Sequence, residues 1–190
     1  MIHLLPHWNH PGMQGRPIPV WVYTTCDEVE LLLNGTSCGR RKTEKYTHLE
    51  WVIPYEPGKL EARGFVNGTL VVSDSHVTTG QPVSLALTPM IENVRSGGGE
   101  LALFVCTALD ADGMEVPDAE MTVSFDCQHG TVIASGSAIT DHTPVTMPDR
   151  RMYAGRITVA VKPDAGAEKL TLLARSSGMQ TAFLDFSLQA

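Results

Sequence analysis

The feature that most constrains the fold of this chain is a repeated alternation of apolar and polar residues, broken at intervals by Asn-Gly pairs. Alternation with a period of two is the signature of a half-buried β-strand. The segment EVELLLNGTSCGR (28–40) leads into its turn at Asn34-Gly35, and KLEARGFVNGTLVVSDSHV (59–77) turns at Asn67-Gly68. Both residues of an Asn-Gly pair tolerate the positive φ values of a two-residue hairpin turn. The two segments therefore predict antiparallel β-hairpins.

Two more strands are expected in the first half of the chain. PVWVYTTC (19–26) alternates clearly, with Val20, Val22 and Thr24 on one face and Trp21 and Tyr23 on the other. HLEWVIPY (48–55) offers three residues for burial: Leu49, Val52 and Ile53. Trp21 and Trp51 lie inside these strands and are predicted to be core residues, because large aromatic side chains in strands are usually buried. A small antiparallel sandwich is expected from about Pro17 to Val77.

The segment TTGQP (78–82) interrupts the alternation and is typical of a short linker. Seven further strands follow, with turn signals at regular spacing, as in an immunoglobulin-like sandwich. Residues 137–151 are the exception, a polar stretch with two prolines that is either a functional loop or a mobile one. The predicted fold is all-β, with two consecutive antiparallel β-sandwiches: one over residues 1–78 and an immunoglobulin-like one over 82–190.

Composition limits the partners of the chain. The formal net charge of −7 argues against nucleic acid, whose binding surfaces concentrate basic residues. Arg40, Arg41 and Lys42 form a basic cluster after a turn, for which a solvated loop is expected. No segment reaches the roughly 18 apolar residues of a membrane span, and the N-terminus does not resemble a signal peptide. We expect no nucleic-acid or membrane partner, and a cytoplasmic location is favoured over secretion.

The four cysteines show no CxxC pair and no metal-ligand spacing. Free, mostly buried thiols are favoured over disulfide bonds. The sequence also contains no GxSxG elbow and no phosphate-binding glycine loop followed by a helix and lysine. Nucleophilic and phosphoryl-transfer chemistry are therefore not expected in this chain, and no cofactor is predicted.

Glycosidic cleavage requires two carboxylates about 5 to 9 Å apart across a sugar. The acidic residues of the first half are instead predicted at solvent-facing strand positions or in loops: Glu28, Glu30, Glu50, Glu61 and Asp74. No two of them are marked as a buried pair. The chain alone is predicted to be inactive.

Two segments resemble metal sites, but neither is predicted to bind a metal. His3, His7 and His10 have ligand-like spacing, yet two prolines interrupt any helix there and no further ligand completes a zinc set. The segment DADG (110–113) begins like a calcium loop, but Met121 stands where the EF-hand requires glutamate. A turn between two strands explains this segment better. No metal site is predicted.

Trp8 lies between polar neighbours in a predicted loop and is the best candidate for contact with a ligand or another domain. Flat aromatic faces stack on sugars as well as on other core residues. His7, Asn9 and His10 flank the ring and complete this candidate sugar-binding or domain-contact site.

The segment HLLPHWNHPGMQGRPIPVWVYTTCDEVELLLNGTSCGR (3–40) resembles the region that follows the catalytic barrel in bacterial family-2 glycoside hydrolases of the β-galactosidase type. The resemblance is carried by these residues: His3, Pro6, His7, Trp8, Asn9, VWVY (20–23), DEVE (27–30), Asn34, Gly35 and Gly39. HLEWVIPYEPGKLEARGF (48–65) matches the stretch that follows. The second half resembles the terminal immunoglobulin-like domain more loosely, through DADGMEVPDAEMTVSF (110–125). His10 replaces a tryptophan usual in the family, which removes one stacking face.

The resemblance implies a parent enzyme that hydrolyses a β-galactoside, or a related β-glycoside, with retention through two glutamates on a barrel. This chain would hold two non-catalytic domains that buttress the barrel and edge its cleft, so the expected partners are the barrel and a galactoside or other oligosaccharide. Two alternatives stay open. One is a stand-alone carbohydrate-binding module acting through Trp8 or an exposed Trp51, and the other is a cell-surface spacer.

Overall fold

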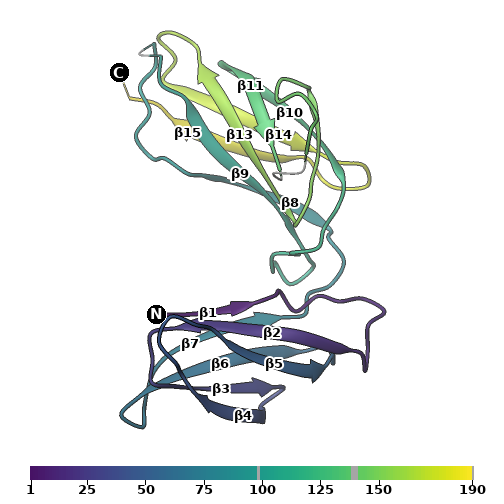
Figure 1. Ribbon diagram of the computed structural model, residues 1–190. Coiled ribbons are helices and arrows are strands. Elements are labelled where there is room, and N and C mark those ends of the chain that lie inside the picture. The colour runs from purple at the N-terminus through teal and green to yellow at the C-terminus, as the bar shows by residue number, and fades with distance from the viewer. Residues whose placement is uncertain (98, 138–140, 190) are drawn as a thin grey trace. The chain divides into compact units, whose positions relative to one another are not determined.

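The computed structural model describes residues 1–97, 99–137 and 141–189, and every regular element within them is a β-strand (Figure 1). The chain divides into two compact units, Met1–Thr78 and Thr79–Ala190. Each unit contains two antiparallel sheets and its own hydrophobic core. The predicted fold class is confirmed. None of the described residues forms a helix with the length and hydropathy needed to cross a membrane.

The first unit pairs a three-stranded sheet, in the order β1-β2-β5, with a four-stranded sheet, in the order β4-β3-β6-β7 (Figure 1). The strands of the unit are β1 (Ile2–Leu5), β2 (Pro17–Thr24), β3 (Glu28–Leu33), β4 (Thr36–Lys42), β5 (Leu49–Pro54), β6 (Lys59–Val66) and β7 (Thr69–Val77). Alternate residues of each sheet meet in one core, including Val20 of β2, Leu31 of β3 and Leu60 of β6.

The two Asn-Gly pairs form the predicted hairpin turns. Asn34 and Gly35 have φ values of 50° and 81°, and they join β3 to β4. Asn67 and Gly68 have φ values of 48° and 79°, and they join β6 to β7. Positive φ at both central residues matches the right-handed twist of the flanking strands, which explains why these pairs set the register of both hairpins.

Two side-chain predictions for this unit are wrong. Val52 is 69% exposed because β5 buries Leu49, Trp51 and Ile53 on its inner face. Trp21, predicted in the core, is 43% exposed because β2 buries its even-numbered residues instead.

The basic cluster Arg40–Lys42 is part of strand β4 and not a loop. Arg40 Nη2 lies 2.7 Å from Glu28 Oε2, and its guanidinium lies over the Phe65 ring at 3.7 Å. The cluster is therefore tied to neighbouring strands by an ion pair and a cation–π contact, although its side chains remain accessible to solvent.

The second unit has two four-stranded sheets, in the orders β12-β10-β14-β15 and β11-β13-β9-β8. Its strands are β8 (Ser84–Pro89), β9 (Ala102–Leu109), β10 (Thr122–Gln128), β11 (Gly130–Gly136), β12 (Asp149–Arg151), β13 (Arg156–Pro163), β14 (Lys169–Arg175) and β15 (Ala182–Ser187). Phe104 and Phe186 meet edge to face at 5.3 Å in the core between the sheets. Strand β12 falls inside the segment predicted to be an irregular loop, of which residues 138–140 lie outside the described residues.

The DADG segment is a turn, as predicted. Asp110 Oδ1 accepts hydrogen bonds from the backbone nitrogens of Asp112 at 3.0 Å and Met114 at 2.9 Å, and Oδ2 accepts one from Gly80 at 2.9 Å. The bonds from Gly80 and Met114 hold the pKa of this carboxyl below its usual range. An Asp side chain that bonds the backbone two residues on is the usual device of such turns.

Candidate functional site

Trp8 is part of the core of the first unit and is 0% exposed. Its Nε1 donates a hydrogen bond to the backbone oxygen of Glu56 at 2.9 Å, and its ring meets Tyr55 edge to face at 5.1 Å. The exposure expected for a loop tryptophan is therefore wrong, because the segment folds back onto the 55–58 turn. The ring acts as an anchor within its own unit.

Thr78 and Tyr55 fix the backbone of the same segment. Thr78 Oγ1 donates to the carbonyl oxygen of Trp8 at 2.6 Å and accepts a bond from the Gly58 nitrogen at 3.1 Å. Tyr55 OH lies 3.5 Å from the Trp8 carbonyl oxygen. Residues far apart in sequence thus converge on one peptide group, which gives the predicted site a rigid frame.

The two histidines beside Trp8 stack on each other. The rings of His7 and His10 have centroids 5.1 Å apart and are inclined by 22°, and His10 also meets Tyr55 edge to face. The backbone nitrogen of Asn9 donates to His7 Nδ1 at 3.2 Å, which fixes the orientation of the His7 ring. Stacked, nearly parallel rings do not direct their nitrogens to one point, as a metal would require.

His3 lies apart from the other two histidines, on β1, with Nδ1 3.6 Å from Asp74 Oδ2. Within residues 1–97, 99–137 and 141–189, no three His, Cys, Asp or Glu side chains form a group that could hold a metal ion. The structure therefore brings together His7, Trp8, Asn9 and His10, and leaves His3 outside.

The acidic residues singled out in the sequence have separate partners. Glu50 lies 2.7 Å from His48, Glu30 accepts a bond from Ser37 Oγ at 2.7 Å, and Asp74 accepts one from the Leu4 nitrogen at 2.9 Å. Glu28 pairs with Arg40, as described above. None of these four is paired with another carboxylate as a glycosidase requires.

Glu61 is the fifth of these acids and pairs with Arg63 at 3.1 Å and Lys59 at 3.5 Å. The hydrogen bond from Arg63 lowers the pKa of the Glu61 carboxyl. A general acid for glycosidic cleavage needs the opposite shift, a raised pKa that keeps its proton at neutral pH. This residue is therefore suited to a structural ion pair.

Two exposed aromatic residues of the first unit lie on the outer face of β2. Trp21 and Tyr23 are 43% and 40% exposed. The ring centroid of His48, the residue before β5, lies 5.2 Å from each of theirs. Sequence reasoning missed this face because it weighted Trp21 toward the core, although alternation in PVWVYT already placed Trp21 and Tyr23 opposite Val20 and Val22. Trp51, by contrast, is buried as predicted.

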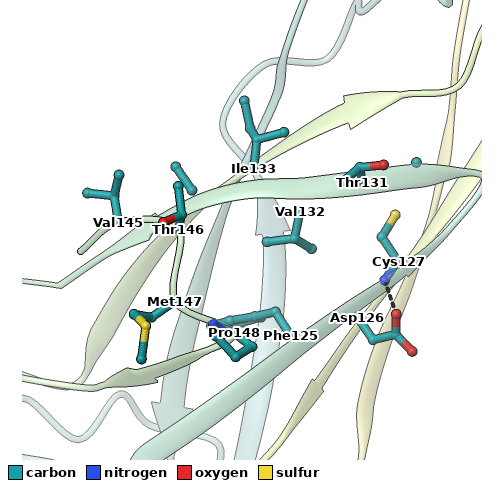
Figure 2. Close-up of a pocket in the computed structure, with 12 residues that line it drawn as sticks. Phe125, Asp126, Cys127, Thr131, Val132, Ile133, Val145, Thr146, Met147 and Pro148 are labelled. Carbon is teal, nitrogen blue, oxygen red and sulfur yellow. Dashed lines mark hydrogen bonds between the residues drawn. The ribbon is translucent and has the colours of Figure 1, made fainter. Parts of the chain in front are cut away.

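A cavity of about 290 Å³ lies between β10, β11 and residues 145–148 of the second unit. Figure 2 shows Val132 on one side of β11 and Ile133 on the other, with Met147 and Pro148 nearby. Burial and neighbouring carboxylates raise the pKa of the Cys127 thiol at its margin to about 11. The thiol is therefore protonated at neutral pH and is a poor nucleophile.

Residues 141–148 are held in place by the buried side chain of Arg150. Its Nη1 lies 2.7 Å from Asp141 Oδ2, and its Nη2 donates to the Pro144 carbonyl oxygen at 2.8 Å. Arg150 Nε also donates to Ser135 Oγ of β11 at 3.2 Å. Hydrogen bonds from Thr143 and then from Arg150 hold the pKa of the Asp141 carboxyl well below its usual range. These bonds connect residues 141–144 to β11 and β12.

Comparisons with known proteins connect both units to one group of enzymes. The family described as "Glycoside hydrolase family 2 C-terminal domain 5" matches residues 85–185, and a "Domain of unknown function (DUF4982)" matches residues 15–72. The chain is 32% identical to "Beta-galactosidase BoGH2A" of Bacteroides ovatus over 100% of its own length and 22% of that protein. It is 40% identical to a "Putative beta-glucuronidase" of Formosa agariphila over 67% of its own length and 13% of that protein.

A solved structure shares the fold of almost the whole chain. A β-glycosidase from Bacteroides vulgatus superposes with a TM-score of 0.91 and 33% sequence identity, covering 98% of this chain and 24% of the solved one. The chain therefore spans less than a quarter of the length of each of these similar proteins.

Proposed function

The chain belongs to glycoside hydrolase family 2 and corresponds to a C-terminal region of its enzymes. We propose that it is a non-catalytic part of a longer enzyme that cleaves β-glycosides. The observation that carries the proposal is that the whole chain aligns with a β-galactosidase but covers only 22% of its length. The acidic side chains of the first unit agree with a non-catalytic role, because each is bonded to a different partner. The two glutamates of a retaining reaction would lie on the barrel of that enzyme.

The substrate proposed for the longer enzyme is a β-galactoside. The relative that this chain matches end to end is named a β-galactosidase, and this supports the proposal more strongly than the partial match to a putative β-glucuronidase. In this proposal the pocket that distinguishes a galactoside from a glucuronide lies in the barrel. The present chain supports the barrel and does not select the substrate.

The segment His7–His10 is proposed to be the part of the first unit that supports the barrel. Trp8 serves as its internal anchor, since its indole and its carbonyl oxygen are both bonded within the unit. The residues beside Trp8 are held in fixed positions: His7 and His10 stack on each other, and the Asn9 nitrogen is bonded to His7. A rigid element of this kind positions a neighbouring domain better than a free loop does.

The test compares the 190-residue chain with the complete reading frame that encodes it, using a chromogenic β-galactoside. We expect hydrolysis by the product of the complete frame, which should encode a barrel with two glutamates before Met1, and no hydrolysis above buffer by the chain alone. An enzyme-like rate from the isolated chain, or a frame without a barrel, would contradict the proposal. The same assay with a β-glucuronide tests the proposed substrate separately.

A further inference from the structure

The outer face of the β1-β2-β5 sheet combines exposed aromatic rings with an accessible ion pair between His48 and Glu50. We propose that this face, together with the recess beside it, binds a neutral oligosaccharide. We define the aromatic face as Trp21, Tyr23, His48 and Glu50. The proposal does not depend on the enzyme to which the chain belongs.

The rings of the aromatic face form a continuous surface. His48 lies between Trp21 and Tyr23, with centroid distances of 5.2 Å to each and interplanar angles of 49° and 34°. The even-numbered residues of β2 fill the core, so the sandwich does not need these outward rings for its interior. Sugar rings present patches of C–H groups that pack on partly exposed aromatic faces of this kind.

A carboxylate and an imidazole supply hydrogen bonds next to the rings. Glu50 pairs with Trp21 in the ladder between β5 and β2, and its side chain is 60% exposed. His48 Nε2 lies 2.7 Å from Glu50 Oε1, which orients the carboxylate along the aromatic face. The second oxygen of the carboxylate is available to accept bonds from sugar hydroxyls.

A recess of about 390 Å³ lies at the end of β2, lined by residues that follow Tyr23 and precede His48 in the chain. Its lining begins one residue after Tyr23 and includes the loop that leads to His48: Thr24, Thr25, Cys26, Asp27, Thr43, Glu44, Lys45 and Tyr46. The Thr24 and Thr25 hydroxyls bond the Met1 backbone oxygen, and Asp27 accepts a bond from the Asn67 nitrogen, so Thr43, Glu44 and Tyr46 supply the groups offered to a ligand. The hydroxyl oxygen of Thr43 is buried and has no hydrogen-bond partner among the described residues. Such a volume, lined by hydroxyl-bearing side chains, is of a size that admits a sugar unit.

The charges around the face select the class of ligand. Glu50, Asp27 and Glu44 place three carboxylates on or beside it, against two cations, Lys45 in the recess and Arg41 at the Glu50 backbone oxygen. This excess of negative charge, together with the net charge of −7 of the whole chain, disfavours an acidic sugar. A protein partner would have to bury Glu50 together with several hydroxyl groups, which costs free energy unless each group finds a matching bond. A neutral oligosaccharide leaves the carboxylate partly solvated and bonds the hydroxyls.

The experiment titrates the 190-residue chain with a neutral galacto-oligosaccharide, a cello-oligosaccharide and an oligogalacturonate, and follows the Trp21 indole resonance by NMR. We expect saturable shifts with at least one neutral sugar in the millimolar range, and none with oligogalacturonate. Trp21→Ala should weaken binding by roughly tenfold, as loss of an aromatic contact does. His48→Ala should weaken it as well, because it removes the ring between Trp21 and Tyr23.

Val52→Ala is the matched control, since Val52 is 69% exposed on the same sheet but is not one of the four residues of the aromatic face. It should leave binding and the melting temperature unchanged. The absence of saturable binding to both neutral sugars, or equal losses in the Trp21 and Val52 variants, would overturn the proposal. If Trp21→Ala lowers only the melting temperature of the complete enzyme and no sugar binds, the face is a domain contact and the proposal is wrong. Neither result bears on the hydrolysis assay.

Discussion

The indole of Trp8 satisfies two requirements at the same time. Its ring removes a large apolar area from water, and its single polar group is bonded to the Glu56 carbonyl oxygen. A buried tryptophan usually needs both, because an unbonded N–H in the core costs free energy. This combination explains how a residue from a polar, proline-flanked segment becomes a core residue.

Trp8→Ala should therefore destabilise the protein strongly. We expect a loss of about 3 to 5 kcal/mol in the free energy of unfolding, the range for truncating a large buried aromatic residue. Trp21→Ala is the comparison, and its effect should stay near 1 kcal/mol because part of the ring is already in water. Urea denaturation followed by circular dichroism measures both. Equal losses in the two variants would show that Trp8 is not the anchor that the contacts describe.

The tryptophans also show where prediction from sequence stops at the level of residues. Alternation separates the two faces of a strand, and it correctly grouped Val20 with Val22 and Trp21 with Tyr23. It does not say which face is inward when both faces carry large apolar residues, so Trp21 was misplaced. Trp8 was misplaced for a different reason, because its burial depends on Tyr55 and Thr78, which are distant in sequence.

At the level of elements, local chemistry decided what could be predicted. The Asn-Gly turns encode their own conformation, so the hairpins β3-β4 and β6-β7 follow from short segments. Strand β12 and the loop before it do not follow from local sequence, since residues 141–148 are ordered by the guanidinium of Arg150. A buried arginine that bonds several loop carbonyls cannot be recognised before the strands are placed.

Asp141→Asn tests this loop through its pH dependence. The pKa of the Asp141 carboxyl is lower in the folded protein than its ordinary value of 3.8, so the ionised group stabilises the fold above about pH 4. That contribution is lost as the pH falls through the folded pKa. We expect the variant to melt below the wild type at pH 7, with the difference shrinking as the pH falls below about 4.

The control for this measurement is Asp149→Asn, which removes a charge from an exposed residue next to Arg150. It should change the melting temperature much less at pH 7. If the gap between wild type and Asp141→Asn stayed constant from pH 7 to acid, the ion pair with Arg150 would not be the source of the stabilisation.

At the level of the whole molecule, each unit is stabilised by its own core and by no cross-link. The four cysteines are free, two of them buried and two partly buried, as the sequence analysis favoured. Burial raises the pKa of the Cys106 thiol to about 12 and that of Cys127 to about 11, and burial also raises the pKa of Cys38. Thiols that stay protonated react slowly with disulfide reagents.

The native chain should therefore react slowly with a thiol reagent at neutral pH, and denaturation should release all four thiols without added reductant. Unfolding exposes each sulfur to water and restores the ordinary pKa of Cys38, Cys106 and Cys127, so the reaction becomes fast. The measurement is the absorbance of released reagent, with and without denaturant, and a sample treated with reductant first gives the reference of four thiols per chain. A count of two in the denatured, unreduced sample would mean that one disulfide forms, and the stability of the molecule would then rest on a covalent link in addition to its two cores.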